Sequence, residues 1–191
     1  MRRVLYLSHP EVRIDPAIPV PDSSLSGLGR ARIGAALNRG WPGPGWTILS
    51  SPETKARETA ALLAAATGDP VGIHAGMAEV DRSSTGYVPH ARHEELADAL
   101  FADPARGPEG WESAAAAQAR IVAAYRASLA ETPGDLLLVG HGAVGTFLRL
   151  HLAGLPIARV HDQPCGGCVW RFTPDMPDQP PTPWQRLEET A

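Results

Sequence analysis

The alternation of apolar and polar stretches along the chain predicts short strands that alternate with longer helices. Five apolar, β-favouring runs of four to six residues are typical of strands. They lie at 4–7, 46–49, 71–74, 135–139 and 167–172. Five stretches rich in helix formers, most of them followed by glycine or proline, predict helices. These helices cover 25–38 (starting near Ser26), 53–66, 93–101, 112–130 and 143–152.

The run at 135–139 is apolar at every position after Asp135, as expected of a strand buried on both faces. Strands that alternate with helices around such a strand indicate an α/β fold. We therefore predict a three-layer α/β/α sandwich around a mostly parallel, doubly wound sheet. No repeat or linker divides residues 1–172, which we interpret as one domain. Residues 173–191 are polar and rich in proline, which predicts an extended or poorly ordered C-terminal tail.

Two histidines lie where a sheet of this kind binds ligands. Ligands of doubly wound sheets bind at the carboxyl ends of the strands. His9 follows the first predicted strand, and His141 follows the buried strand at 135–139. We therefore expect both side chains to contribute to a single site.

Composition restricts the classes of function. The net charge of −4 argues against a nucleic-acid-binding surface, so phosphate chemistry would depend on a few local cations. No apolar run reaches the length of a membrane span. The first apolar run ends after four residues, so we interpret it as a strand rather than a signal peptide and expect a cytoplasmic protein. Lys55 is the one lysine among seventeen cationic side chains.

The potential metal ligands do not form a recognisable site. Cys165 and Cys168 have CxxC spacing, but no second pair completes a zinc site, so we expect two semi-buried thiols. His161 lies near the cysteines, and His90 and His93 are loosely spaced. We predict that the protein uses neither a metal ion nor a cofactor.

Six short segments, in order and each in a suitable strand, helix or loop, resemble motifs of the histidine phosphatase superfamily, the phosphoglycerate-mutase-like proteins. Each segment alone is weak evidence, but the ordered series covers most of residues 4–172. The segments are Ser8-His9-Pro10, Leu25-Ser26-Gly27-Leu28-Gly29, Ser50-Ser51-Pro52 with Lys55 and Thr59-Ala60, Met77-Ala78-Glu79, Gly110-Trp111-Glu112-Ser113 and Val139-Gly140-His141-Gly142.

The resemblance implies a metal-independent phosphohydrolase that acts on a small phosphomonoester. His9 has the position of the nucleophile, a neutral imidazole that becomes a phosphohistidine before water releases phosphate. His141 and the positions of Lys55 and Ser8 would stabilise the phosphoryl oxygens. Glu79 has the position of the acid that protonates the leaving oxygen, although the nearby Asp81 is an alternative.

The chain departs from the family pattern at three of these positions. Ser8 and Lys55 stand where the family has arginine, and Pro10 replaces a glycine and so removes a backbone donor. The loss of a bidentate arginine contact costs roughly ten- to a thousandfold in phosphate affinity or rate. Arg13 and Arg82, on loops expected to border the pocket, are candidates to replace the missing charge.

These departures leave three functions open. The chain is either a weak or atypical phosphatase, or a catalytically impaired member that binds a phosphate-type anion or a protein partner. A phosphoglycerate-mutase-type phosphotransferase is less favoured, because the family's mutases carry extra segments near the acid that this chain lacks. The sequence specifies neither the substrate nor the oligomeric state.

Overall fold

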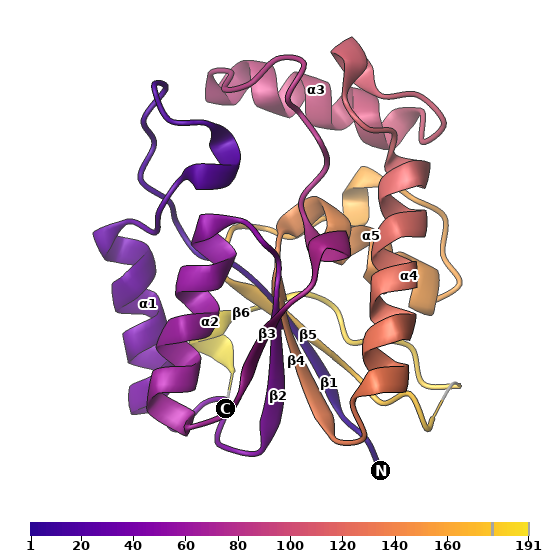
Figure 1. Ribbon diagram of the computed structural model, residues 1–191. Coiled ribbons are helices and arrows are strands. Elements are labelled where there is room, and N and C mark those ends of the chain that lie inside the picture. Colours follow the sequence, from indigo (N-terminus) through magenta and orange to yellow (C-terminus); the bar gives the residue numbers. More distant parts are fainter. Residues whose placement is uncertain (177, 191) are drawn as a thin grey trace.

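The structure is a computed structural model, and it describes residues 1–176 and 178–190 (Figure 1). The strands are β1 (Val4–Ser8), β2 (Trp46–Ser50), β3 (Val71–Ile73), β4 (Asp135–Gly140), β5 (Cys168–Phe172) and β6 (Gln185–Arg186). The helices are α1 (Gly27–Asn38), α2 (Thr54–Thr67), α3 (His90–Ala102), α4 (Ala114–Glu131) and α5 (Gly142–Leu152). All the predicted strands and helices are therefore confirmed, with ends shifted by a few residues. Among the described residues, no helix is long and apolar enough to cross a membrane.

The six strands form one sheet in the order β3-β2-β4-β1-β5-β6. Strands β3, β2, β4 and β1 pair in parallel, whereas β5 pairs antiparallel with β1, and β6 antiparallel with β5. The prediction of a mostly parallel sheet is confirmed. Because β1 and β4 are parallel neighbours in the centre, their carboxyl ends lie side by side.

Successive side chains of the central strands point to opposite faces of the sheet, and each face has its own core. Tyr6, Leu138 and Trp170 belong to the core under α4 and α5. Leu7 and Val139 belong to the core under α1 and α2. Figure 1 shows these helix pairs on opposite sides of the sheet, which confirms the three-layer sandwich.

The C-terminal segment differs from the prediction of an extended or poorly ordered tail. Its described residues include β6, and the Leu187 side chain is completely buried. The Trp184 indole donates a hydrogen bond to Thr146 of α5 at 3.1 Å. Trp184 and Leu187 hold the segment against the domain. The prediction missed them because it rested on the overall composition, which is dominated by prolines.

Tyr6 connects the sheet to the segment that carries His141. Its ring is completely buried and stacks on Trp170 with 5.2 Å between the ring centroids. Its hydroxyl donates to the carbonyl of His141 and accepts from the His141 N–H, both at 3.0 Å. The backbone of His141 is thereby fixed from inside the core.

Gly140 leaves room for this tyrosine, and we expect Gly140→Ala to lower the free energy of unfolding by about 2–3 kcal/mol. A Cβ atom on Gly140 would lie 2.3 Å from the Tyr6 hydroxyl oxygen, so the stacked ring would have to move. Gly34→Ala in α1 is the matched control, because nothing lies within 4 Å of its Cβ. It should raise stability by roughly 0.5–1 kcal/mol. Urea denaturation measures both changes, and equal effects would contradict the close approach at Gly140.

Candidate active site

His9 and His141 meet at the carboxyl edge of the sheet. The strand register places Ser8 opposite Gly140, and the His9 N–H donates to the Gly140 carbonyl at 2.9 Å. The two imidazole rings are nearly perpendicular, with 5.2 Å between their centroids. The structure therefore brings the two imidazole rings together at one edge of the sheet.

Among the described residues, only one nitrogen of the His9 ring has a hydrogen-bond partner. Its Nδ1 lies 2.8 Å from the Pro10 carbonyl oxygen, which can only accept a hydrogen bond. In the neutral ring Nδ1 therefore carries the proton and Nε2 carries the lone pair. Burial, aided by the positive charges of Lys55 and Arg82, lowers the pKa of His9 to about 4. His9 is thus a neutral imidazole at pH 7 with an available Nε2.

His141 is completely buried beside two polar side chains from the segment that precedes α2. Its Nε2 lies 2.6 Å from the Ser51 Oγ and 3.5 Å from a carboxylate oxygen of Glu53. Burial, together with the charges of His9 and Lys55, lowers the pKa of His141 well below its ordinary value. Its Nδ1 is buried without a partner among the described residues.

Lys55 lies within the site but is already engaged. Only 4% of the residue is exposed, and its Nζ donates to a carboxylate oxygen of Glu53 at 2.5 Å. The same Nζ donates to the Val20 carbonyl oxygen at 2.7 Å. Sequence reasoning did not assign Ser51 or Glu53 to the site. One feature of the sequence could have pointed to Glu53: it is an acidic residue that directly follows Ser-Ser-Pro, two positions before the one lysine.

The Glu79 carboxylate lies against the first residues of α5, where the residue is half-buried. Its oxygens accept hydrogen bonds from the Ala143 and Val144 N–H groups, both at 3.2 Å, and from its neighbour Val80 at 3.0 Å. Burial raises the pKa of Glu79, an effect larger than the opposing effects of these backbone donors and of Arg82. This carboxyl group can therefore retain a proton at a higher pH than an ordinary glutamate.

Arg120 is a further residue that sequence reasoning did not assign. From α4 its guanidinium donates to the carbonyl oxygens of Gly76, Ala78 and Glu79, at 3.0, 2.8 and 3.2 Å. Arg120 also forms an ion pair with Glu112 at 2.6 Å. It thereby holds the irregular segment before Glu79 in place.

Asp81 has a different environment from Glu79. It is exposed, and its carboxylate accepts a hydrogen bond from the Ser83 N–H at 2.8 Å, which lowers its pKa. Asp81 is therefore ionised at lower pH than an ordinary aspartate. Of the two carboxyl groups left open by the sequence, Glu79 has the environment of an acid that holds its proton.

The remaining sequence-predicted residues are only partly brought together. Arg82 lines the cavity beside Glu79, and its guanidinium lies over the Trp111 ring, 5.5 Å from the centroid. The Ser8 hydroxyl is buried and bonded to the Cys168 backbone, accepting at 3.0 Å and donating at 3.3 Å, so it is engaged away from His9. Arg13 is exposed on its loop and is not among the cavity-lining residues. A phosphate contact from Ser8 or Arg13 stays a prediction.

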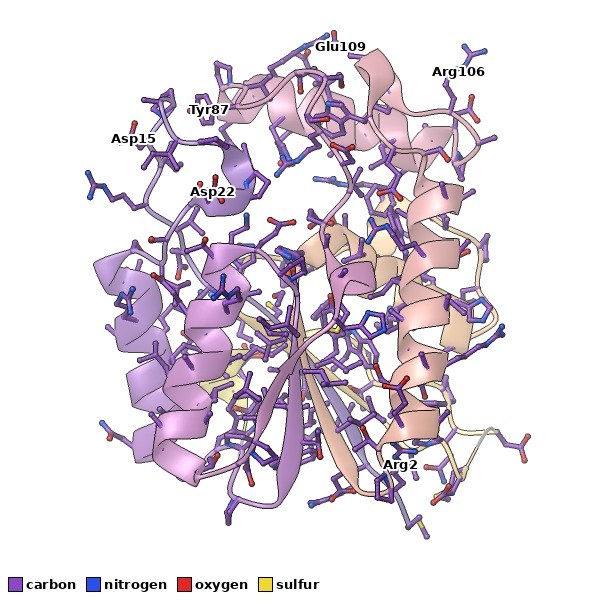
Figure 2. All side chains as sticks on the ribbon, viewed as in Figure 1. Arg2, Asp15, Asp22, Tyr87, Arg106 and Glu109 are labelled. Atoms are coloured by element: carbon purple, nitrogen blue, oxygen red, sulfur yellow. The ribbon has the colours of Figure 1, made fainter. Side chains whose placement is uncertain are left out.

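A cavity of about 1100 Å³ is lined by Glu53 and Glu79, although neither His9 nor His141 is among its lining residues. Figure 2 shows Asp22 and Tyr87, two of its lining residues, at the end of the molecule beyond the carboxyl ends of the strands. The cavity wall combines an apolar loop with charged groups of both signs. It includes residues 16–22, Glu53, Glu79, Arg82, Tyr87, Trp111, Glu112 and Arg120.

The two cysteines lie at or just before the start of β5, where the Cys168 N–H donates to the Ser8 hydroxyl. Their sulfur atoms are 3.6 Å apart and both thiols are free. Two semi-buried thiols were expected, but only Cys165 is half-buried, and Cys168 is completely buried. Burial raises the pKa of the Cys168 thiol to about 12. Within residues 1–176 and 178–190, no three His, Cys, Asp or Glu side chains are grouped to hold a metal ion.

Comparison with family models decides the family. Residues 16–177 match the histidine phosphatase superfamily (branch 1). The chain belongs to this superfamily. The matched segment begins after Ser8-His9-Pro10, so the role of His9 is argued from its place beside His141 in this histidine phosphatase fold.

Solved structures of phosphatases share this fold. A mycobacterial glucosyl-3-phosphoglycerate phosphatase is 25% identical, with a TM-score of 0.73 and 89% of each chain covered. A structure of the same protein with VO3 is 26% identical, with a TM-score of 0.71 and 91% of each chain covered. An Entamoeba histolytica phosphoserine phosphatase is similar in fold, at 17% identity and a TM-score of 0.74, over 98% of this chain and 100% of that one. No curated protein sequence matches the chain.

The neutral His9 and His141 rings should make this member of the superfamily sensitive to acid. The pKa of His9 is about 4 in the folded chain and about 6.5 in an unfolded one, so the unfolded chain binds more protons between these values. Stability therefore falls as pH drops from 6.5 to 4, by up to about 3 kcal/mol from His9 alone. His141 acts in the same direction, whereas Glu79, with its raised pKa, acts in the opposite one.

Urea denaturation at a series of pH values tests this expectation. Wild type should lose stability more steeply than His9→Gln below pH 6.5, and the difference between the two slopes reports the His9 contribution. Parallel slopes would show that the pKa of His9 is not lowered by folding.

Proposed function

We propose that this protein is a phosphohydrolase that acts on a phosphomonoester through a phosphohistidine at His9. The observation that carries the proposal is the neutral His9 ring, whose free Nε2 lies beside buried His141 at the carboxyl edge of the sheet. Membership of the histidine phosphatase superfamily and the similarity to a phosphatase at 25% identity support it.

Each step of the proposed reaction has a residue available. The Nε2 lone pair of His9 forms a bond to phosphorus while the bond from phosphorus to the leaving oxygen breaks. Glu79 donates its proton to that leaving oxygen. In the second step Glu79 takes a proton from water, whose oxygen attacks phosphorus, and the P–N bond breaks to restore His9 and release phosphate. Lys55, Arg82 and His141 supply positive charge or donors for the phosphoryl oxygens.

We expect the rate to be low for a histidine phosphatase. The family arginine before the nucleophile is Ser8, whose hydroxyl is bonded to the Cys168 backbone. The ammonium group of Lys55 is paired with Glu53. Of the positive charges expected around the phosphoryl group, one is therefore missing at Ser8, and that of Lys55 is already neutralised by Glu53.

The cavity bears on the choice of substrate. Its volume of about 1100 Å³ exceeds what a phosphate group alone requires, and the loop at 16–21 contributes an apolar wall. We therefore infer a small phosphomonoester whose leaving group has an apolar part.

A second candidate function is a catalytically impaired family member that binds a phosphate-type anion. The pairing of Lys55 with Glu53 and the engagement of the Ser8 hydroxyl favour this alternative, because both reduce the stabilisation of a developing charge. Under this alternative His9 and His141 bind the anion without attacking it.

Trapping the intermediate distinguishes these functions. The protein is mixed with an aryl phosphate and a metal chelator, quenched in alkaline denaturant, which preserves phosphohistidine, and digested for mass spectrometry. A phosphoryl group on the His9 peptide, together with release of inorganic phosphate, supports the phosphohydrolase. Anion binding without an adduct or turnover supports the impaired member, and transfer to an added alcohol in preference to water indicates a phosphotransferase.

A further inference from the structure

A carboxylate already lies among the cationic and hydrogen-bonding groups of the site. One oxygen of Glu53 accepts from Lys55 Nζ at 2.5 Å. The other accepts from the Glu79 N–H at 2.8 Å and lies 3.5 Å from His141 Nε2. The side chains of Glu53 and Lys55 are only 9% and 5% exposed.

These contacts are those that a phosphoryl oxygen would need. A buried carboxylate requires charged or hydrogen-bonding partners to offset its loss of hydration, and Glu53 finds them in Lys55 and the Glu79 N–H. A carboxylate oxygen and a phosphoryl oxygen are both anionic acceptors, so they compete for the same donors.

We propose that Glu53 is an internal anion that occupies the phosphate-binding donors of this site and must be displaced by substrate. The inference rests on the proposed function in one respect, namely that Lys55 and His141 are the groups that bind phosphate. It makes Glu53 a specificity-determining residue: free phosphate competes poorly with it, whereas an ester that gains further contacts in the cavity displaces it.

The loop above the cavity is part of the same arrangement. Lys55 Nζ also donates to the carbonyl oxygen of Val20, in the 3-10 turn Val20–Asp22. Val20 and its neighbours line the cavity. An incoming phosphate that takes Lys55 from Glu53 can leave this loop contact intact, so displacement of the carboxylate does not require the loop to open.

Glu53→Gln tests the proposal, because the amide keeps the shape of the side chain but not its negative charge. Titration with inorganic phosphate, followed by calorimetry or by ³¹P NMR, should show binding about 10- to 100-fold tighter than in wild type, the equivalent of one charge-assisted hydrogen bond. Glu58→Gln is the matched control: Glu58 lies on α2, the helix that Glu53 precedes, and pairs with Arg30 and the Leu25 N–H, outside the site. It should bind phosphate as wild type does.

The kinetic signature separates competition from a merely structural role. In Glu53→Gln the KM for a compact phosphoester should fall more than the KM for an ester with a bulky apolar group, because the bulky ester already displaces the carboxylate. A general loss of packing would raise both KM values. If Glu53→Gln does not fold by circular dichroism, Glu53→Ala replaces it in the same titration.

The outcomes of this titration and of the His9 trapping experiment are independent. Tighter phosphate binding in Glu53→Gln supports the internal anion. If no variant shows turnover, that absence contradicts the proposed phosphohydrolase but leaves the internal anion supported. Unchanged or weaker binding in a folded Glu53 variant overturns the internal anion, even when His9 is phosphorylated and turnover is observed.

Discussion

Replacement of His9 by alanine is expected to lower kcat/KM for an aryl phosphate by at least about a thousandfold, the scale seen when a covalent nucleophile is removed. The reason is the state of the ring: Pro10 fixes the proton on Nδ1, and the lowered pKa keeps Nε2 unprotonated down to about pH 4. Ser51, the nearest hydroxyl to His141, is completely buried and bonded to that histidine, so it is a poor replacement nucleophile.

Two further measurements show whether the loss of kcat/KM in His9→Ala arises from the missing nucleophile rather than from weaker phosphate binding or misfolding. His9→Ala should still bind inorganic phosphate within a few-fold of wild type, because Lys55, Arg82 and His141 remain. His151→Ala, on the exposed side of α5, should keep wild-type kcat/KM. Substantial turnover in His9→Ala, with the same pH dependence as wild type, would sink the phosphohistidine mechanism.

The acid limb of the rate profile provides an independent check on His9. Because its pKa is about 4, kcat/KM of the wild-type protein should stay high through mildly acidic pH and fall as pH drops through about 4. A histidine with an ordinary pKa would place that fall near 6.5.

The layers of the fold and the two histidines could be predicted because their signals are local. A strand that is apolar throughout, such as the stretch 136–139, is expected to be buried on both faces, and this places it in the centre of the sheet. A residue that directly follows a parallel strand lies at the carboxyl edge whatever the rest of the chain does. These two rules were enough to predict that His9 and His141 lie at the same edge of the sheet, and β1 and β4 are indeed neighbours.

The charge state of the pocket could not be predicted, because it depends on side-chain directions that sequence spacing does not specify. Lys55 is neutralised by Glu53, which precedes α2 and so lies outside the helical spacing that sequence patterns reveal. The Ser8 hydroxyl is engaged by Cys168 of β5, a strand that lies 160 residues later in the sequence. Resemblance of motifs identifies such positions, but the directions of their side chains come only from tertiary packing.

The C-terminal segment shows the same limit. Its prolines favour an irregular chain, yet the segment is ordered because Trp184 and Leu187 pack against the domain. Burial of one large side chain contributes roughly 1.5–3 kcal/mol, which is enough to order a short segment that composition alone would assign to a tail.

Glu79→Gln is expected to slow the hydrolysis of an ester with a poor leaving group, such as phenyl phosphate, by roughly 10²- to 10⁴-fold. The glutamine keeps the shape and can keep one of the two hydrogen bonds from α5, the one to its carbonyl oxygen, but it cannot release a proton. With a good leaving group, such as 2,4-dinitrophenyl phosphate, the departing oxygen needs no proton, and the loss should be less than about tenfold. Steady-state kinetics with both esters measures the two ratios.

The pH dependence completes the argument for Glu79 as the acid. Because burial raises the pKa of Glu79, the wild-type rate on phenyl phosphate should fall on the alkaline side at a pH above the ordinary range of a glutamate, and Glu79→Gln should lose this limb. Asp81→Asn is the comparison: its carboxylate is exposed and has a lowered pKa, so its effect should be smaller and similar for both esters. Equal losses for the two esters in Glu79→Gln, with a leaving-group dependence in Asp81→Asn, would instead assign the proton to Asp81. Such a result would place proton transfer in the solvated part of the cavity rather than at the buried start of α5.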